Sequence, residues 1–382
     1  SDMVSVPVNS LLVRSLGHRL IPSSSFVLNL SLPFQPSASS SHRSFTTSTN
    51  RYARFRGTPG PSQLKEIGLV LPQSHVPYES GQLFIHRLFA YKGIILCSFN
   101  CKLHERRENA TELACSEEVQ YQVLIHRGDW AHMGFPVDVT AYLAESNSIA
   151  VRGEKMMTTM NGLDCVSHAD IIPFVGTERS PIDHDLFERL FLPIEQTSRD
   201  SLPTVRYGIR SEIRSFYMQS SRSWMAPIHV NRETTNGVEV TVTTFYLGPN
   251  IVSGSHKHMW RYVIRLHNLT NNCVTLRERQ LKVFSLNNMH QLNGTGVVGR
   301  QPELTPSRPA FQYSSTVELS QSKGGHMWGS FKMERHNGIL FDVAIPMFTL
   351  DASDAPPTPT PSPPIHPSSP PPPHPTIDNS SH

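Results

Sequence analysis

The stretch "GVEVTVTTFYL", Gly237 to Leu247, decides the fold of this 382-residue chain. Its apolar residues alternate with polar ones, which is the pattern of a β-strand that buries one face. "WRYVIRLHN" from Trp260 and "GILFDVAIPMF" from Gly338 repeat this alternation. The expected apolar faces consist of Val238, Val240, Val242 and Tyr246; of Trp260, Tyr262, Ile264 and Leu266; and of Ile339, Phe341, Val343 and Ile345.

Further β-type runs surround these three. "CVTLRERQLKVFSL", "FQYSSTVELS" and "HMWGSFKMER" bring the expectation to about seven strands separated by turn signals. Residues 231–350 are therefore predicted to form a two-sheet antiparallel β-sandwich.

An earlier segment, residues 63–180, carries shorter strands such as "LFAYKGIILCSF" and "VQYQVLIHRG". Without a repeated βα pattern, a small β-barrel is favoured over a parallel sheet. The polar run "HERRENATELACSEE" between the two strands is interpreted as a long loop. Residues 181–230 are predicted to be a helical connector, with one helix from Asp183 to Pro193 and a second over Thr204 to Gln219.

The two ends of the chain differ from its body. Residues 1–62 hold six arginines, no lysine and one acid, so they carry +5; this composition favours a mitochondrial presequence, with a merely disordered N-terminus as the alternative. Residues 351–382 are dominated by "APPTPTPSPPIHPSSPPPPHPT", which predicts a disordered, polyproline-type tail. The candidate kinase sites in this tail are Thr358, Thr360, Ser362 and Ser369.

Charge and cysteine usage limit the classes of function. The net charge is +3, which leaves about −2 outside residues 1–62 and gives no sign of a strongly basic body. The five cysteines lack C-x-x-C spacing, which argues against a disulfide framework and favours a reducing compartment. Two metal sites can be drawn, from Cys97, Cys101 and His104 and from the pair His256 and His258, but neither has a complete ligand set. We predict no metal and no cofactor.

Gly294, Gly296 and Gly299 fit the G-x-G-x-x-G fingerprint of dinucleotide-binding loops. That fingerprint works only where a helix begins directly after it. Pro302 and Pro306 exclude such a helix here, so the glycines are interpreted as residues that supply positive φ angles to a loop between strands. Since G-x-S-x-G, H-E-x-x-H and P-loop motifs are also missing from the sequence, we expect no enzyme and no catalytic residues.

Two sets of motifs resemble known families. "GTGVVGRQPEL", "GHMWGSFKMER" and "FDVAIPMFTL" resemble the ApaG domain, an immunoglobulin- or fibronectin-like sandwich with a characteristic G-x-G-x-x-G loop and no established catalytic activity. "GQLFIHRLFAYKGIILCSF", "YQVLIHRGDW" and "GLDCVSHADIIPF" resemble the YccV-like domain, an SH3-like barrel named for hemimethylated-DNA binding in bacterial relatives. Their order, over roughly Ile67 to Leu350, is similar to that of the polymerase delta-interacting protein family.

This resemblance implies a monomeric, non-enzymatic adaptor of the mitochondrial matrix, also found in the nucleus. The implied partners are DNA polymerase subunits, the sliding clamp, primase-polymerase and the ClpX unfoldase. We predict partner contacts at the glycine loop and at "GHMW", that is, at Gly294, Gly296, Gly299, Arg300, His326, Met327 and Trp328. The alternative is direct DNA binding by the barrel, through Lys102, Arg106 and Arg107.

Overall fold

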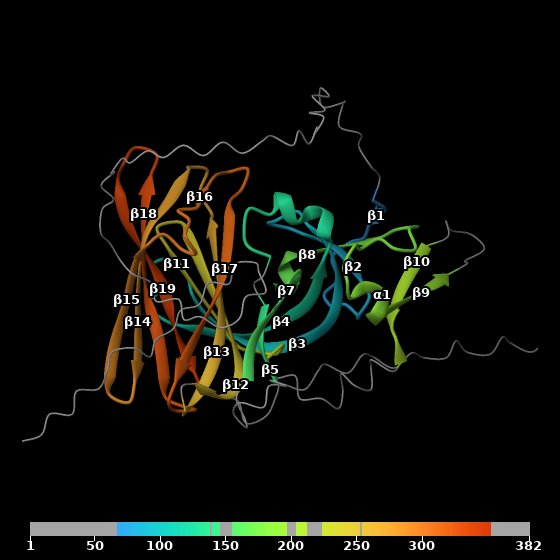
Figure 1. Ribbon diagram of the computed structural model, residues 1–382. Helices are drawn as coiled ribbons and strands as arrows, with labels where there is room; N and C mark the ends of the chain where they lie inside the picture. The colour runs from blue at the N-terminus through green and yellow to red at the C-terminus, as the bar shows by residue number, and fades with distance from the viewer. Residues whose placement is uncertain are drawn as a thin grey trace, which may run out of the picture.

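The computed structural model describes residues 67–137, 140–145, 155–196, 204–211, 224–252 and 254–352. The predicted presequence, the Pro-rich tail and the second predicted helix beyond residue 211 lie outside these ranges. Within them, strands dominate and two β modules lie side by side (Figure 1). In the described part of the chain, no helix is both long and apolar enough to cross a membrane.

The first module is a small, strongly curved sheet with the strand order β8-β2-β3-β4-β7. Strands β7 and β8 are consecutive in the chain yet lie at opposite ends of this order, so the sheet curls around its own core as an SH3-like barrel does. The bounds are β1 (Leu69–Val70), β2 (Leu83–His86), β3 (Lys92–Arg106), β4 (Ala114–Ile125), η1 (Arg127–His132), β7 (Leu163–Ser167), η2 (His168–Asp170) and β8 (Ile171–Val175). A separate hairpin joins β5 (Thr140–Glu145) to β6 (Lys155–Met160).

Two predictions in this half of the chain are wrong in detail. The "long loop" is a hairpin, because β3 continues to Arg106 and pairs with β4 from Ala114. Within the described residues of the connector, the first predicted helix is reduced to a single turn, α1 (Phe187–Leu190). The antiparallel pair β9 (Phe191–Gln196) and β10 (Thr204–Ile209) follows, so the second predicted helix is wrong over Thr204–Ile209.

The segment Thr204–Ile209 forms a strand and not the predicted helix, because its packing against the barrel core outweighs the helical spacing of its apolar residues. In β10, Val205 and Tyr207 are buried with the barrel core while Arg206 between them is exposed. This is the period of a strand.

The second module confirms the predicted sandwich. One sheet has the order β11-β12-β13-β17, and the other has the order β15-β14-β18-β19 with β16 beside β14. The bounds are β11 (Pro227–Thr235), β12 (Val238–Val252), β13 (Ser255–Asn268), β14 (Val274–Ser285), β15 (Asn288–Thr295), β16 (Glu303–Leu304), β17 (Ala310–Leu319), β18 (Gly325–Arg335) and β19 (Leu340–Leu350).

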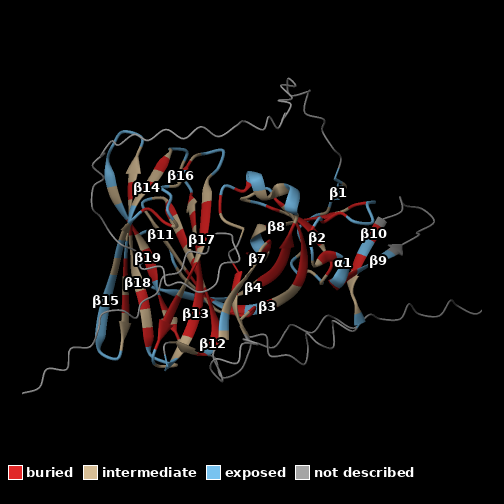
Figure 2. Cartoon of the chain, viewed as in Figure 1, coloured by how far each residue is buried: buried red, intermediate tan, exposed pale blue. Residues whose placement is uncertain are grey.

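The apolar faces predicted for β12 and β13 are buried between the two sheets (Figure 2). Val238, Val240, Val242, Trp260 and Ile264 have 0% of their surface exposed. On β19 the inner face is likewise buried, but Ile339 precedes the strand and is exposed. Burying apolar side chains at about 25 cal/mol per Å² is the main stabilising contribution to such a core.

The two modules share a sheet. Strand β11, the first of the sandwich, runs parallel to the end of β3, with His229 beside Lys102 and Glu233 beside Arg106. A ten-stranded sheet therefore passes from the barrel into the sandwich. One apolar cluster also continues across the junction, from Phe84 and Ile95 in the barrel to Trp260 in the sandwich.

Candidate protein-interaction surfaces

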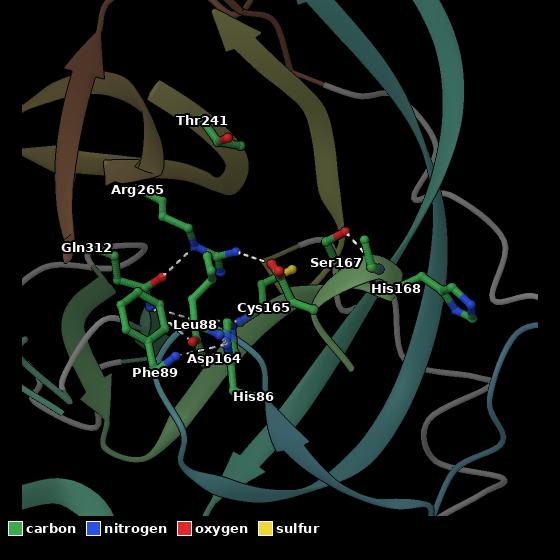
Figure 3. Close-up of polar contacts among 12 residues, drawn as sticks. His86, Leu88, Phe89, Asp164, Cys165, Ser167, His168, Thr241, Arg265 and Gln312 are labelled. Carbon is green, nitrogen blue, oxygen red and sulfur yellow. Dashed lines mark hydrogen bonds and ion pairs between the residues drawn. The ribbon is translucent and has the colours of Figure 1, made fainter. Parts of the chain in front are cut away.

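A buried polar network joins the two modules (Figure 3). Arg265 on β13 donates to Asp170 of the barrel at 2.6 Å and to the side-chain oxygen of Gln312 at 3.2 Å. Gln312 on β17 in turn donates to both carboxylate oxygens of Asp164 at 2.9 Å. Asp164 also accepts hydrogen bonds from the Tyr91 hydroxyl and the Cys165 amide. The network fixes how the sandwich sits on the barrel.

Burial and neighbouring charges shift the pKa values of the ionisable side chains at this junction. Burial alone would raise the pKa of Asp170, but the charge of Arg265 outweighs it, so that the pKa of this carboxyl is lowered overall. Burial and the charge of Arg265 lower the pKa of His86 to about 3, so this imidazole is neutral near pH 7. Its Nδ1 accepts hydrogen bonds from the backbone amides of Leu88 and Phe89.

A second polar contact joins the modules where β11 meets β3. Arg232 of β11 lies within 3.5 Å of both Glu105 on β3 and Glu118 on β4, and it also faces Glu239 on β12. One guanidinium therefore bridges carboxylates of both modules. These Arg232 ion pairs, the shared sheet and the Asp170 network together hold the barrel and the sandwich in one fixed arrangement.

The glycine loop is a tight turn rather than a nucleotide cradle. Gly296 and Gly299 have φ angles of +61° and +73°, as predicted, whereas Gly294 is a residue of strand β15 that lies under the Arg279 guanidinium. Val298 and Gly299 form a two-residue turn. Two backbone hydrogen bonds between Val297 and Arg300 close this turn. The chain then continues into strand β16, so no helix follows the loop.

Val298 in this turn has a φ of +43°. A β-branched residue adopts the left-handed region only where surrounding structure imposes it. Here Val297 beside it is completely buried, and the amide of Gly296 is held by the carbonyl of Arg277 at 2.8 Å. The loop is therefore rigid.

A cleft of about 560 Å³ lies beside this loop, between the two modules; we call it the junction cleft. Its sandwich wall consists of Arg300 to Glu303, Thr305, Ser307, Arg308, Ala310 and Phe311. Its barrel wall consists of Leu88 to Tyr91, Asp129 and His132 to Gly134. Arg300 spans its rim and donates to the carbonyl of Gly134 at 3.3 Å. Ala90 on the barrel wall of the cleft has a φ of +56°.

The second predicted contact, "GHMW", lies on strand β18 and not in a loop. Met327 is fully buried in the core, while His326 and Trp328 alternate with it toward the outer face of the sandwich. The "GHMW" segment and the glycine loop contact strand β14 at different positions. The amide of Gly296 donates to the carbonyl of Arg277, whereas His326 pairs with Phe284, seven residues further along β14. The structure therefore does not bring the two predicted contacts together.

The three predicted nucleic-acid contacts lie near the end of β3 among carboxylates. Arg106 pairs with Glu233 at 3.5 Å, and Arg107 pairs with Glu105 at 3.1 Å. Lys102 is exposed and stands opposite Glu117 in the antiparallel register. Ion pairing of this kind offsets much of the positive charge that a phosphate backbone would attract.

Cys101 and His258, one residue from each of the two drawn metal sites, have other roles in the structure. Cys101 is buried on β3, which raises the pKa of its thiol to about 12. His258 lies on β13, and its Nδ1 is 2.7 Å from the Tyr246 hydroxyl. Among the residues that the structure describes, no group of three or more His, Cys, Asp and Glu side chains is arranged to hold a metal ion.

The barrel wall of the junction cleft and the junction network are not predicted from the sequence. Arg261 and Arg265 occupy the polar side of the β13 alternation, yet the barrel covers this side and Arg261 is 1% exposed. No local pattern marks a polar residue that a second module will cover. The strand alternation would place Met347 on the inner face with Val343 and Ile345, but a bulge between Ile345 and Phe348 leaves it exposed.

Comparison with known proteins agrees with this architecture. Residues 250–335, which include the glycine turn and most of the sandwich, match the family model described as the ApaG domain. The chain is also 38% identical over 121 residues to Protein ApaG of Brucella anthropi, which covers 31% of this chain and 92% of that protein. The second module is thus an ApaG-type sandwich.

The similarity to a second group of relatives extends over both modules. The chain is 37% identical over 332 residues to Polymerase delta-interacting protein 2 of Homo sapiens, with 82% of this chain and 87% of the relative covered. The corresponding identity for the Mus musculus protein is 36%. The chain therefore belongs to the polymerase delta-interacting protein 2 family.

Proposed function

We propose that this chain is a non-enzymatic adaptor that binds partner proteins at the junction cleft. Membership of a family whose human and mouse members are named polymerase delta-interacting proteins suggests a protein-interaction role. The observation that carries the proposal is the position of Arg300: a rigid turn places it at the rim of a cleft that both modules line.

Three properties of the junction cleft suit an interaction site. It is concave, and its lining combines polar groups with half-buried apolar side chains such as Leu88 and Phe89. Its walls are fixed by a shared sheet and a buried network, so little conformational entropy is lost on binding. The left-handed backbone of Ala90, on the barrel wall of the cleft, is the kind of strain that concentrates at functional positions.

We further propose the compartment and the partners that the family resemblance implies. The compartment is the mitochondrial matrix, with a second population in the nucleus. The partners are DNA polymerase subunits, the sliding clamp, primase-polymerase and the ClpX unfoldase. Direct DNA binding through Lys102, Arg106 and Arg107 is the alternative, and the ion pairs of the two arginines disfavour it.

The test is partner capture by the tagged full-length chain from separate mitochondrial and nuclear extracts, each with and without nuclease. Adaptor function predicts that polymerase or unfoldase subunits are retained after nuclease treatment. The extract in which they appear identifies the compartment. Retention that disappears with nuclease, and that weakens steeply with salt, would support the DNA-binding alternative instead. Retention of no protein in either extract would contradict the proposal.

A further inference from the structure

The outer face of the sheet formed by β15, β14, β18 and β19 carries a second surface, away from the barrel (Figure 1). Phe284 on β14 lies between Met289 on β15 and His326 on β18. In the neighbouring row, Lys282 lies beside Trp328, and a bulge in β19 between Ile345 and Phe348 places Met347 opposite Trp328. We call this set the outer-face patch: Lys282, Phe284, Met289, His326, Trp328 and Met347.

Several apolar side chains of the outer-face patch are open to solvent. Met289 is 55% exposed and Met347 is 62% exposed, while Phe284 and Trp328 are half-buried. The rings of Phe284 and His326 lie 6.4 Å apart. Aromatic and methionine side chains of this kind are enriched in the centres of protein interfaces.

The patch is also held rigidly. The residues that alternate with it, Leu281, Val283 and Met327, are fully or almost fully buried in the sandwich core. Because side chains of a strand point alternately to its two faces, these anchors keep Lys282, Phe284 and Trp328 turned outward. The apolar groups cannot withdraw into the core without breaking the strand pairing.

The charge of the outer-face patch indicates which kind of partner residue it can bind. The ion pairs that the described residues form on this sheet are Arg277–Glu334 and Lys332–Asp342, so those carboxylates are already engaged. Within the described part of the chain, Lys282 has no carboxylate within ion-pairing distance. An uncompensated ammonium beside a tryptophan favours an acidic group of a partner and disfavours a basic one.

We propose that the outer-face patch binds a short partner segment in which apolar side chains flank an acidic residue. The apolar side chains pack on Phe284, Trp328 and Met347, and the carboxylate pairs with Lys282. A second copy of this chain fits less well, because a symmetric contact would bring two Lys282 side chains together. The proposal rests on the adaptor function only in that both require a protein partner, since the patch and the junction cleft are different surfaces.

The experiment is selection of a random displayed short-peptide library on the purified full-length protein. Selected peptides are expected to carry an acidic residue between apolar ones. Their affinity should fall about tenfold or more, a change of about 1.4 kcal/mol, in Lys282→Glu and in Met347→Ser. Selection on Lys282→Glu should favour basic residues instead. The matched controls are Lys102→Glu and Met156→Ser, both at exposed positions elsewhere, which should bind the peptides as the wild type does.

Three results would overturn the proposal: no peptide is enriched, the enriched peptides lack acidic residues, or they bind Lys282→Glu as tightly as the wild type. Both patch variants change exposed or half-buried side chains, and thermal unfolding of each confirms that the fold is retained. Since no extract is used, failure here leaves the junction-cleft proposal standing. Conversely, failed partner capture would leave peptide binding at the patch intact.

Discussion

The guanidinium of Arg265 donates a hydrogen bond to the carboxylate of Asp170 at 2.6 Å across the junction between barrel and sandwich. Both side chains are largely buried, with 13% and 15% of their surface exposed. The pair connects two modules that are otherwise recognisable as separate β units. It therefore explains why the junction cleft has fixed walls.

Removing one partner of this pair should lower the stability of the folded protein. Arg265→Gln leaves the Asp170 carboxylate buried without its cation, and we expect the free energy of unfolding to fall by about 3 kcal/mol. Urea denaturation measures this change. The control is Arg107→Gln, because Arg107 is 82% exposed and its pair should contribute less than about 1 kcal/mol. Equal effects of the two variants would contradict a structural role for the junction pair.

Stability should depend on pH through His86. Its pKa is lowered to about 3 in the folded state, so between about pH 6.5 and 3 the unfolded chain binds a proton that the folded chain does not. This contribution to stability is complete above pH 6.5 and is lost as the pH falls. The slope attributable to one proton is about 1.4 kcal/mol per pH unit.

His86→Asn retains an acceptor for the amides of Leu88 and Phe89 but cannot be protonated. We expect the free energy of unfolding of this variant to fall less steeply with pH than that of the wild type between pH 6 and 4, by about 1.4 kcal/mol per unit. His336→Asn, an exposed position, provides the comparison. An unchanged slope in His86→Asn would contradict the assignment.

The two left-handed glycines should differ in how they tolerate alanine. A Cβ at Gly296 would lie 2.0 Å from the Arg300 carbonyl oxygen, whereas a Cβ at Gly299 meets nothing within 4 Å. We expect Gly299→Ala to destabilise the chain by about 1 kcal/mol, from the φ angle alone. Gly296→Ala should destabilise it by more and should displace the turn. Comparison of the two unfolding curves tests this, and a larger effect at Gly299 would refute it.

Cysteine labelling should follow burial. Cys101 is buried and its thiol pKa is raised to about 12, while Cys115 is exposed. A thiol-specific reagent near pH 8 should modify Cys115 in the native protein and reach Cys101 only after unfolding. Mass spectrometry of labelled peptides reads the order directly. Early modification of Cys101 would show that strand β3 opens readily.

The sandwich could be predicted because its strands bury one face against the other sheet. Val238, Val240 and Val242 show this pattern, and it survives in the structure. Strand β15 was not predicted, since "NMHQLNGT" lies at a sheet edge and has no continuous apolar face. For the same reason the sequence predicts a loop at Gly294, where the structure has the end of this strand.

Contacts between modules account for most of what the sequence did not reveal. The alternation of β13 places Arg261 and Arg265 on a polar face, but the barrel covers that face. The parallel pairing of β11 with β3 joins segments more than 120 residues apart, beyond the reach of any local signal. The positive φ angles of Gly296 and Gly299 could be predicted, because the prolines that follow exclude a helix.

The most direct test of the adaptor account is quantitative partner capture by paired variants in nuclease-treated extract. Arg300→Glu reverses a charge at the rim of the junction cleft, and Arg107→Glu reverses one at the end of β3. The account predicts that Arg300→Glu loses most of the captured polymerase or unfoldase subunits, while Arg107→Glu retains them. Equal capture by wild type and Arg300→Glu, or a loss confined to Arg107→Glu, would contradict it.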